Sequence, residues 1–152
     1  MNLGPRHQLV LDERWLIPAT RDRVFEALTT PDLLARWWGP VGFTVPEIDL
    51  DLAPGGRYRF GMQPPEGPMF HLDGEFVTLE PPRLLAYTFA WDPPDPDDQE
   101  TVVRLTLEES GGATTLDLSQ GEFLTEARLE LHRAGWSDSV AKLTALLGDR
   151  RS

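Results

Sequence analysis

The 152-residue sequence contains no cysteine, which excludes disulfides, thiolate nucleophiles and cysteine-based zinc or iron–sulfur sites. It also lacks any run of about 18 apolar residues, and its N-terminus has no basic segment followed by an apolar one. We therefore predict neither a membrane span nor a signal peptide, and we expect a cytoplasmic protein. With only three histidines and no Gly-x-Ser-x-Gly motif, the sequence predicts no nucleophilic triad.

Positive charge is also scarce, and the formal net charge is −11. Residues 41–100 hold twelve acidic residues against three arginines, whereas residues 1–40 balance five against five. Such a field repels phosphate backbones and anionic lipid surfaces, and no local basic patch offsets it. Binding to nucleic acid or to a membrane surface is therefore not expected.

The length suits one domain with a sizeable core, and its most regular pattern lies at residues 125–148. Thr125 is a predicted N-cap and Gly148 a predicted left-handed residue after the helix end. Gly135 weakens the middle of this helix, so we expect either close approach of a sheet surface there or a break into two segments. The apolar residues at helical spacing are Leu129, Trp136, Val140, Leu143 and Leu147.

The first 40 residues predict a strand followed by two short helices. Residues 9–17 alternate in the manner of a strand, which Pro18 ends. Thr20 is a predicted cap of the first helix, and Thr30-Pro31-Asp32 begins the second with a capping hydroxyl. Gly39-Pro40 ends that helix.

From residue 41 the apolar pattern has a period of two, which predicts an antiparallel meander. Each strand has one apolar and one polar face, so the sheet is expected to be wet on one side and covered by the long helix on the other. The segment 92–100, with five acids and three prolines, is expected to be a mobile loop. The predicted strands are 43–52, 57–62, 69–79, 84–91, 101–108 and 114–120.

The chain contains, in this order, the segments TRDRVFEALTTPDLLARWWGP, DLDLAPGGRYRFGM, DGEFVTLEPPRLLAYTF and HRAGWSDSVAKLTALL. Together they resemble the bacterial proteins similar to activator of heat-shock protein 90 ATPase, members of the START-like (SRPBCC, helix-grip) superfamily. The resemblance covers residues 9–148 and implies an α+β helix-grip fold. In that fold a curved antiparallel sheet of about seven strands wraps on a long C-terminal helix, with two short helices after the first strand. We expect one START-like domain at 9–148 with flexible ends at 1–8 and 149–152.

One group of ligand-type side chains stands out, His71-x-Asp73-x-Glu75, with its members on one strand face. The opposite face is apolar, so the trio is expected to face solvent and to form cross-strand pairs, Arg57 with Glu75 and Arg59 with Asp73. We predict no metal site, no catalytic residue and no cofactor.

Aromatic residues support the one ligand site that the sequence predicts. His132 can face this cavity or lie at the helix flank beside Glu130 or Arg133, and the flank is the favoured position. An ordinary packed core is the alternative for the aromatic residues, and Gly74 is expected to leave room among them. The predicted cavity residues are Trp37, Trp38, Phe43, Tyr58, Phe60, Phe76, Tyr87, Phe89, His132 and Trp136.

The sequence therefore predicts a non-enzymatic protein that binds a small apolar or aromatic molecule between the sheet and the C-terminal helix. One alternative is a chaperone-interacting module with a filled core and an exposed binding patch. Another is a cyclase-like enzyme in which Tyr58, Tyr87 or His132 steers protons. The fold that the resemblance implies is shared by lipid carriers, hormone receptors, polyketide cyclases and chaperone regulators, so it does not decide among them.

Overall fold

The computed structural model describes residues 9–148, so the predicted flexible ends at 1–8 and 149–152 lie outside the described residues. Each predicted strand and helix is present within a few residues of its expected bounds. In chain order the elements are β1 (Leu11–Ile17), α1 (Arg21–Thr29), α2 (Pro31–Trp37), β2 (Thr44–Leu50), β3 (Arg57–Gln63), β4 (Phe70–Glu80), β5 (Leu84–Asp92), β6 (Thr101–Ser110), β7 (Ala113–Gly121) and α3 (Glu126–Gly148).

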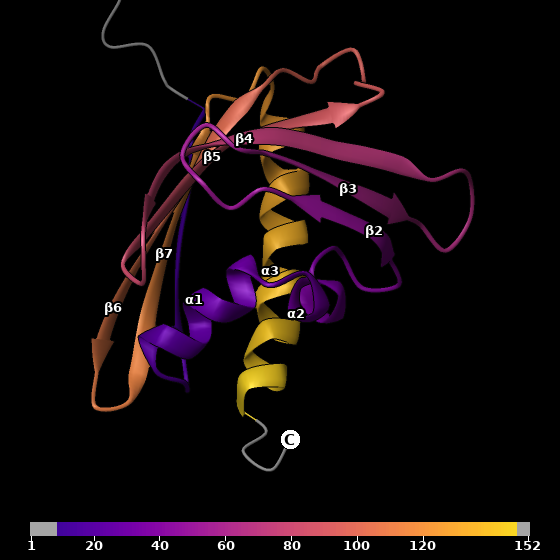
Figure 1. The fold of residues 1–152 in the computed structure, drawn as a ribbon. Helices are drawn as coiled ribbons and strands as arrows, with labels where there is room; N and C mark the ends of the chain where they lie inside the picture. The colour runs from indigo at the N-terminus through magenta and orange to yellow at the C-terminus, as the bar shows by residue number, and fades with distance from the viewer. Residues whose placement is uncertain (1–8, 149–152) are drawn as a thin grey trace, which may run out of the picture.

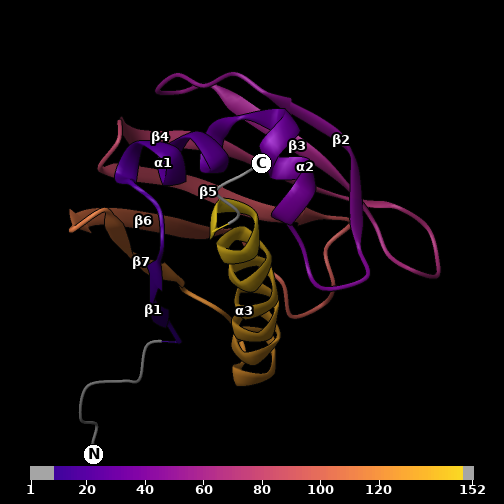
Figure 2. The same ribbon diagram turned by 90° about the horizontal axis from the view of Figure 1, so that it is seen from below.

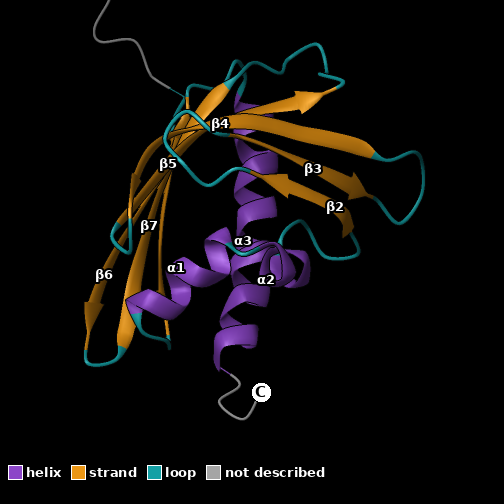
Figure 3. Ribbon diagram, in the orientation of Figure 1, coloured by secondary structure: helices purple, strands orange, loops and turns teal. Residues whose placement is uncertain are grey.

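The seven strands form one antiparallel sheet in the order β1-β7-β6-β5-β4-β3-β2. Figure 1 shows this sheet curving around α3, and the view from below in Figure 2 shows the concave face turned toward the helix. Helices α1 and α2 lie on the same concave side, across the lower half of α3 (Figure 3). The predicted α+β helix-grip fold is confirmed.

The solvent face of the sheet carries the charged residues, as the alternation predicts. The β3–β4 register places Arg57 opposite Glu75 and Arg59 opposite Asp73. The Arg59 Nη1 lies 2.6 Å from the Asp73 Oδ2, and the Arg57 Nη1 lies 3.6 Å from the Glu75 Oε1. Both predicted pairs are exposed, and exposed pairs of this kind contribute little to stability. Their main effect is to keep the outer face solvated.

Helix α3 is continuous through Gly135, so the expected alternative of two segments is wrong. A Cβ at Gly135 would meet the Pro40 Cγ at 3.9 Å, so the segment after α2 approaches this position and the sheet surface does not. Thr125 caps the helix as predicted, because its Oγ1 accepts a hydrogen bond of 3.0 Å from the Arg128 N–H. Gly148, predicted to be left-handed, instead continues the helix.

The two short helices close the lower end of the core. Thr20 accepts a side-chain capping bond from the Arg23 N–H, whereas Thr30 makes no such bond. The predicted capping hydroxyl of Thr30 is therefore wrong, since this residue also ends α1. Gly39 follows α2 with φ of 97°, as expected of a glycine that ends a helix. The Trp37 indole N–H donates to the Ala27 carbonyl at 2.9 Å and joins α2 to α1.

Gly74 does not leave room in the core, so the predicted empty space beside it is wrong. Its cross-strand partner is Tyr58, whose ring covers the glycine: an added Cβ would lie 2.6 Å from the Tyr58 Cζ and closer still to the Thr88 carbonyl oxygen. The Tyr58 hydroxyl donates to that carbonyl at 2.6 Å. Gly74 is thus required for close packing of a tyrosine.

Candidate functional site

A pocket of about 690 Å³ lies beside the N-terminal half of α3. Its walls come from α3, from β3 to β5, and from the segments 39–43 and 92–98. This volume is within the range of small-molecule sites, roughly 300 to 1,000 Å³. Most of the lining is apolar, and its six aromatic side chains are Trp38, Phe43, Phe70, Phe89, Trp91 and Trp136.

The structure divides the ten predicted cavity residues into two groups of five. The pocket lining includes Trp38, Phe43, Phe89, His132 and Trp136. The other five pack in the core and do not line the pocket: Trp37, Tyr58, Phe60, Phe76 and Tyr87.

Two aromatic lining residues, Phe70 and Trp91, were not among the predicted set, although the sequence contains a signal for both. Trp91 continues the alternation of Tyr87 and Phe89, and Phe70 precedes Leu72 by two residues on the same strand face. The rings of Phe70 and Trp91 meet edge to face with centroids 5.3 Å apart. The pocket is therefore lined by inward residues at the start of β4 and at the end of β5.

His132 lies inside the fold, so its predicted position at the helix flank is wrong. Its Nδ1 is 2.9 Å from the Arg128 carbonyl oxygen, and its Nε2 is 3.1 Å from the indole Nε1 of Trp91. A carbonyl only accepts and an indole N–H only donates, so Nδ1 carries the proton and Nε2 accepts. Burial lowers the pKa of His132, which agrees with this neutral tautomer. The ring is thus a fixed wall of the pocket.

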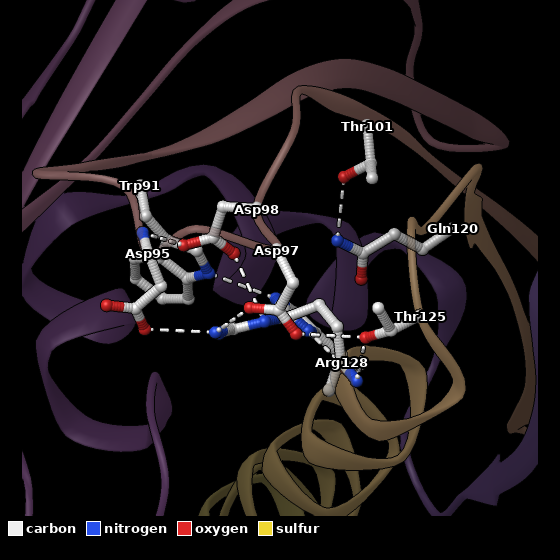
Figure 4. A network of polar contacts seen from close by, with 9 residues as sticks. Trp91, Asp95, Asp97, Asp98, Thr101, Gln120, Thr125 and Arg128 are labelled. Carbon is white, nitrogen blue, oxygen red and sulfur yellow. Dashed lines mark hydrogen bonds and ion pairs between the residues drawn. The ribbon is translucent and has the colours of Figure 1, made fainter.

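Trp136 is held by a buried chain of hydrogen bonds, part of which Figure 4 shows. The Trp136 Nε1–H donates to the Gln120 Oε1 at 2.7 Å, and the Gln120 Nε2 donates to the Thr101 Oγ1 at 2.9 Å. Gln120 is fully buried. The indole ring also meets Trp38 edge to face at 5.3 Å. Packing and hydrogen bonding together fix this ring at the pocket wall.

The segment 92–100, expected to be a mobile loop, is instead held at the start of α3 by ion pairs (Figure 4). The Arg128 Nη2 lies 2.9 Å from an oxygen of Asp95 and 2.9 Å from one of Asp97, and its Nε lies 3.2 Å from the Asp98 Oδ1. The hydrogen bond from Arg128, and then that from Thr125, lowers the pKa of Asp97. Charge pairing with one arginine orders a loop that has little apolar surface to bury.

The other side chains considered for metal binding or proton transfer lie outside the pocket. The Nε2 of His71 lies 3.1 Å from the Glu47 Oε1 at the outer face, and residues 9–148 contain no group of three ligand-type side chains that could hold a metal. Tyr58 donates to a backbone carbonyl, and burial raises the pKa of the Tyr87 hydroxyl. Neither tyrosine lines the pocket.

Comparison with known proteins identifies the family. The family described as activator of Hsp90 ATPase homolog 1-like protein matches residues 18–148. The chain belongs to this family. No curated protein matches the chain. No helix within 9–148 is both long and apolar enough to cross a bilayer.

Solved structures of bacterial proteins share this START-like fold over most of their length. Protein CV1439 from Chromobacterium violaceum is 25% identical with a TM-score of 0.83, over 91% of this chain and 96% of that one. The AHSA1 protein from Silicibacter pomeroyi is 27% identical with a TM-score of 0.80, over 91% and 97%. CalU16 from Micromonospora echinospora, 24% identical with a TM-score of 0.71 over 93% and 78%, shows the fold alone.

Proposed function

We propose that residues 9–148 form a single START-like domain that binds a small apolar or aromatic molecule in the pocket beside α3. The observation that carries the proposal is the contrast between the two ends of the core. Around Gly74 a tyrosine fills the space under the sheet, whereas beside Gly135 a volume of about 690 Å³ stays open between aromatic walls. A protein that needed only stability would gain by filling this space.

The polar groups at the pocket are few and mostly committed to internal hydrogen bonds. His132 uses both ring nitrogens, and the Ser139 Oγ accepts the Gly39 N–H at 3.0 Å. The lining therefore provides a ligand with a shaped, aromatic surface, and few of its polar groups are free to react. This arrangement supports binding more than catalysis, and the ring of His132 has no nitrogen free for the proton transfer of a cyclase-like enzyme.

Gly135 provides a direct test because it lines the pocket on a regular helix, where larger residues are favoured. Gly135→Leu should place a branched four-carbon side chain in the pocket and obstruct it, and Gly135→Ala adds only a methyl group at ordinary contact distance from Pro40. We expect the alanine variant to gain about 1 kcal/mol of stability and to keep binding a neutral apolar fluorescent dye. The leucine variant should remain folded and lose the dye.

The readout is saturable dye fluorescence measured together with urea denaturation of each variant. Equal dye binding by the leucine and alanine variants would place the dye outside the pocket and contradict the proposal. Absence of saturable binding by the unsubstituted protein, across apolar dyes of different sizes, would also contradict it.

A chaperone-interacting module is the second candidate, and family membership favours it. Such a function needs an exposed patch, and Val41 and Leu131 are large apolar residues exposed near the pocket mouth. Stimulation of Hsp90 ATPase activity by the purified protein tests this candidate. Gly135→Leu should leave that stimulation unchanged, because the substitution alters the pocket interior, so the two functions are separable with the same variant.

A further inference from the structure

The charged residues of the pocket lining are predominantly acidic. Three are aspartates, Asp95, Asp98 and Asp138, and the fourth is Arg128. The guanidinium of Arg128 already faces Asp95, Asp98 and the neighbouring Asp97 within 3.2 Å, and its side chain is only 12% exposed. Its positive charge is therefore matched within the protein and cannot receive an anionic ligand.

Asp138 lies at the opposite end of the lining, on the helix face beside Pro40. Its Oδ2 accepts the Val41 N–H at 3.2 Å, and it forms no ion pair with any residue of the described chain. The nearby Lys142 ammonium lies 3.5 Å from the Pro40 carbonyl oxygen and offsets part of this charge. Asp95, Asp97 and Asp98 all lie within ion-pair distance of Arg128 and together carry two more negative charges than it offsets, whereas Asp138 is the acid of the lining that has no ion pair within residues 9–148.

These acids border an aromatic surface. Ten residues separate Arg128 from Asp138 along α3, a distance of about 15 Å at 1.5 Å per residue. Between them α3 presents apolar residues to the pocket, and three tryptophans, Trp38, Trp91 and Trp136, line its wall. Indole faces and carboxylates both attract cations, and the effect is greatest where water is partly excluded.

We propose that the ligand of this pocket is cationic, a small aromatic or apolar molecule that carries an amine or quaternary ammonium group. This inference rests on the proposed function and specifies the ligand class. The apolar part lies against the aromatic wall, and the cationic group lies toward the carboxylate of Asp138. Anionic amphiphiles of the same size are disfavoured by the same field.

Three probes of matched size test the charge preference: naphthylmethyl-trimethylammonium, its neutral carbon isostere neopentylnaphthalene, and naphthylacetate. Equilibrium dialysis gives the dissociation constant of each. We expect the cation to bind about tenfold more tightly than the neutral isostere, and the anion to bind most weakly. Added salt should weaken only binding of the cation.

Asp138→Asn removes the charge and keeps an oxygen that can accept the Val41 N–H. We expect this variant to lose about three- to tenfold in affinity for the cation and to bind the neutral probe as before. Glu130→Gln, an exposed acid on α3 outside the lining, is the matched control and should change neither affinity.

If the neutral isostere binds as tightly as the cation, or if Asp138→Asn weakens both probes equally, the cationic preference is overturned and the binding function stands. If none of the three probes binds, the proposed function is overturned as well.

Discussion

The bond between Trp136 and Gln120 allows a quantitative test of how the pocket wall is built. Trp136→Phe removes the indole N–H and leaves the Gln120 Oε1 without its donor at a fully buried position. An unsatisfied buried acceptor costs about 1 to 3 kcal/mol. The lost ring atoms add roughly 1 kcal/mol at about 25 cal/mol per Å² of buried apolar surface. We therefore expect a total loss of about 2 to 4 kcal/mol.

Gln120→Leu removes the other partner and leaves the N–H of Trp136 and the hydroxyl of Thr101 unpaired. The double variant removes both ends of the bond, so it should be more stable than the sum of the single effects predicts, by at least about 1 kcal/mol. Urea denaturation followed by far-ultraviolet circular dichroism measures all four proteins, because the five tryptophans complicate fluorescence. Strict additivity would show that the hydrogen bond does not stabilise this wall and would refute the reasoning.

Two further predictions concern the packed side of the core and the buried histidine. Gly74→Ala should lower the free energy of unfolding by about 1 to 3 kcal/mol, because the methyl group meets the Tyr58 ring and the Thr88 carbonyl. Gly135→Ala should instead stabilise the protein, and equal effects of the two substitutions in urea denaturation would contradict this contrast. The pKa of His132 is lowered from 6.5 in the folded protein, so at this residue the unfolded chain binds more protons than the folded one as the pH decreases. The stability contributed by neutral His132 is therefore present above pH 6.5 and falls as the pH decreases below it. His132→Gln should remove this part of the pH dependence, and identical pH profiles of the two proteins would exclude it.

The fold could be predicted from the sequence because its elements are local. Period-two alternation and turn residues located the strands, and capping residues such as Thr20 and Thr125 located two of the helix starts. Cross-strand pairs also followed, since a hairpin fixes the register of Arg59 and Asp73. Each inference depends on residues near one another in the chain or across one turn.

The pocket could be predicted only in part because it depends on contacts between distant segments. One face of α3 carries four pocket-lining residues at helical spacing, Arg128, His132, Gly135 and Asp138. Because these residues are charged, polar or lack a side chain, a search for apolar residues at helical spacing does not find this face. The order of the segment 92–100 depends on Arg128, about 30 residues away, which no local composition reveals. The composition of an acidic, proline-rich segment predicts mobility, and this prediction fails where a buried cation pairs with the carboxylates of the segment.

The two glycines explain why the open space lies beside Gly135 and not beside Gly74. A glycine leaves room only where no neighbour enters, and at Gly74 the register brings Tyr58 over the missing side chain. That ring is retained because its hydroxyl donates to the Thr88 carbonyl, and leaving this carbonyl unpaired would cost about 1 to 3 kcal/mol. Gly135 has no such neighbour: only Pro40 approaches it, at 3.9 Å. The pocket therefore persists because its lining residues are fixed by hydrogen bonds within the protein, from Trp136 to Gln120 and from His132 to the Arg128 carbonyl. A ligand can enter without breaking them, so binding should leave the fold unchanged and be controlled by shape and by the charge at the pocket mouth.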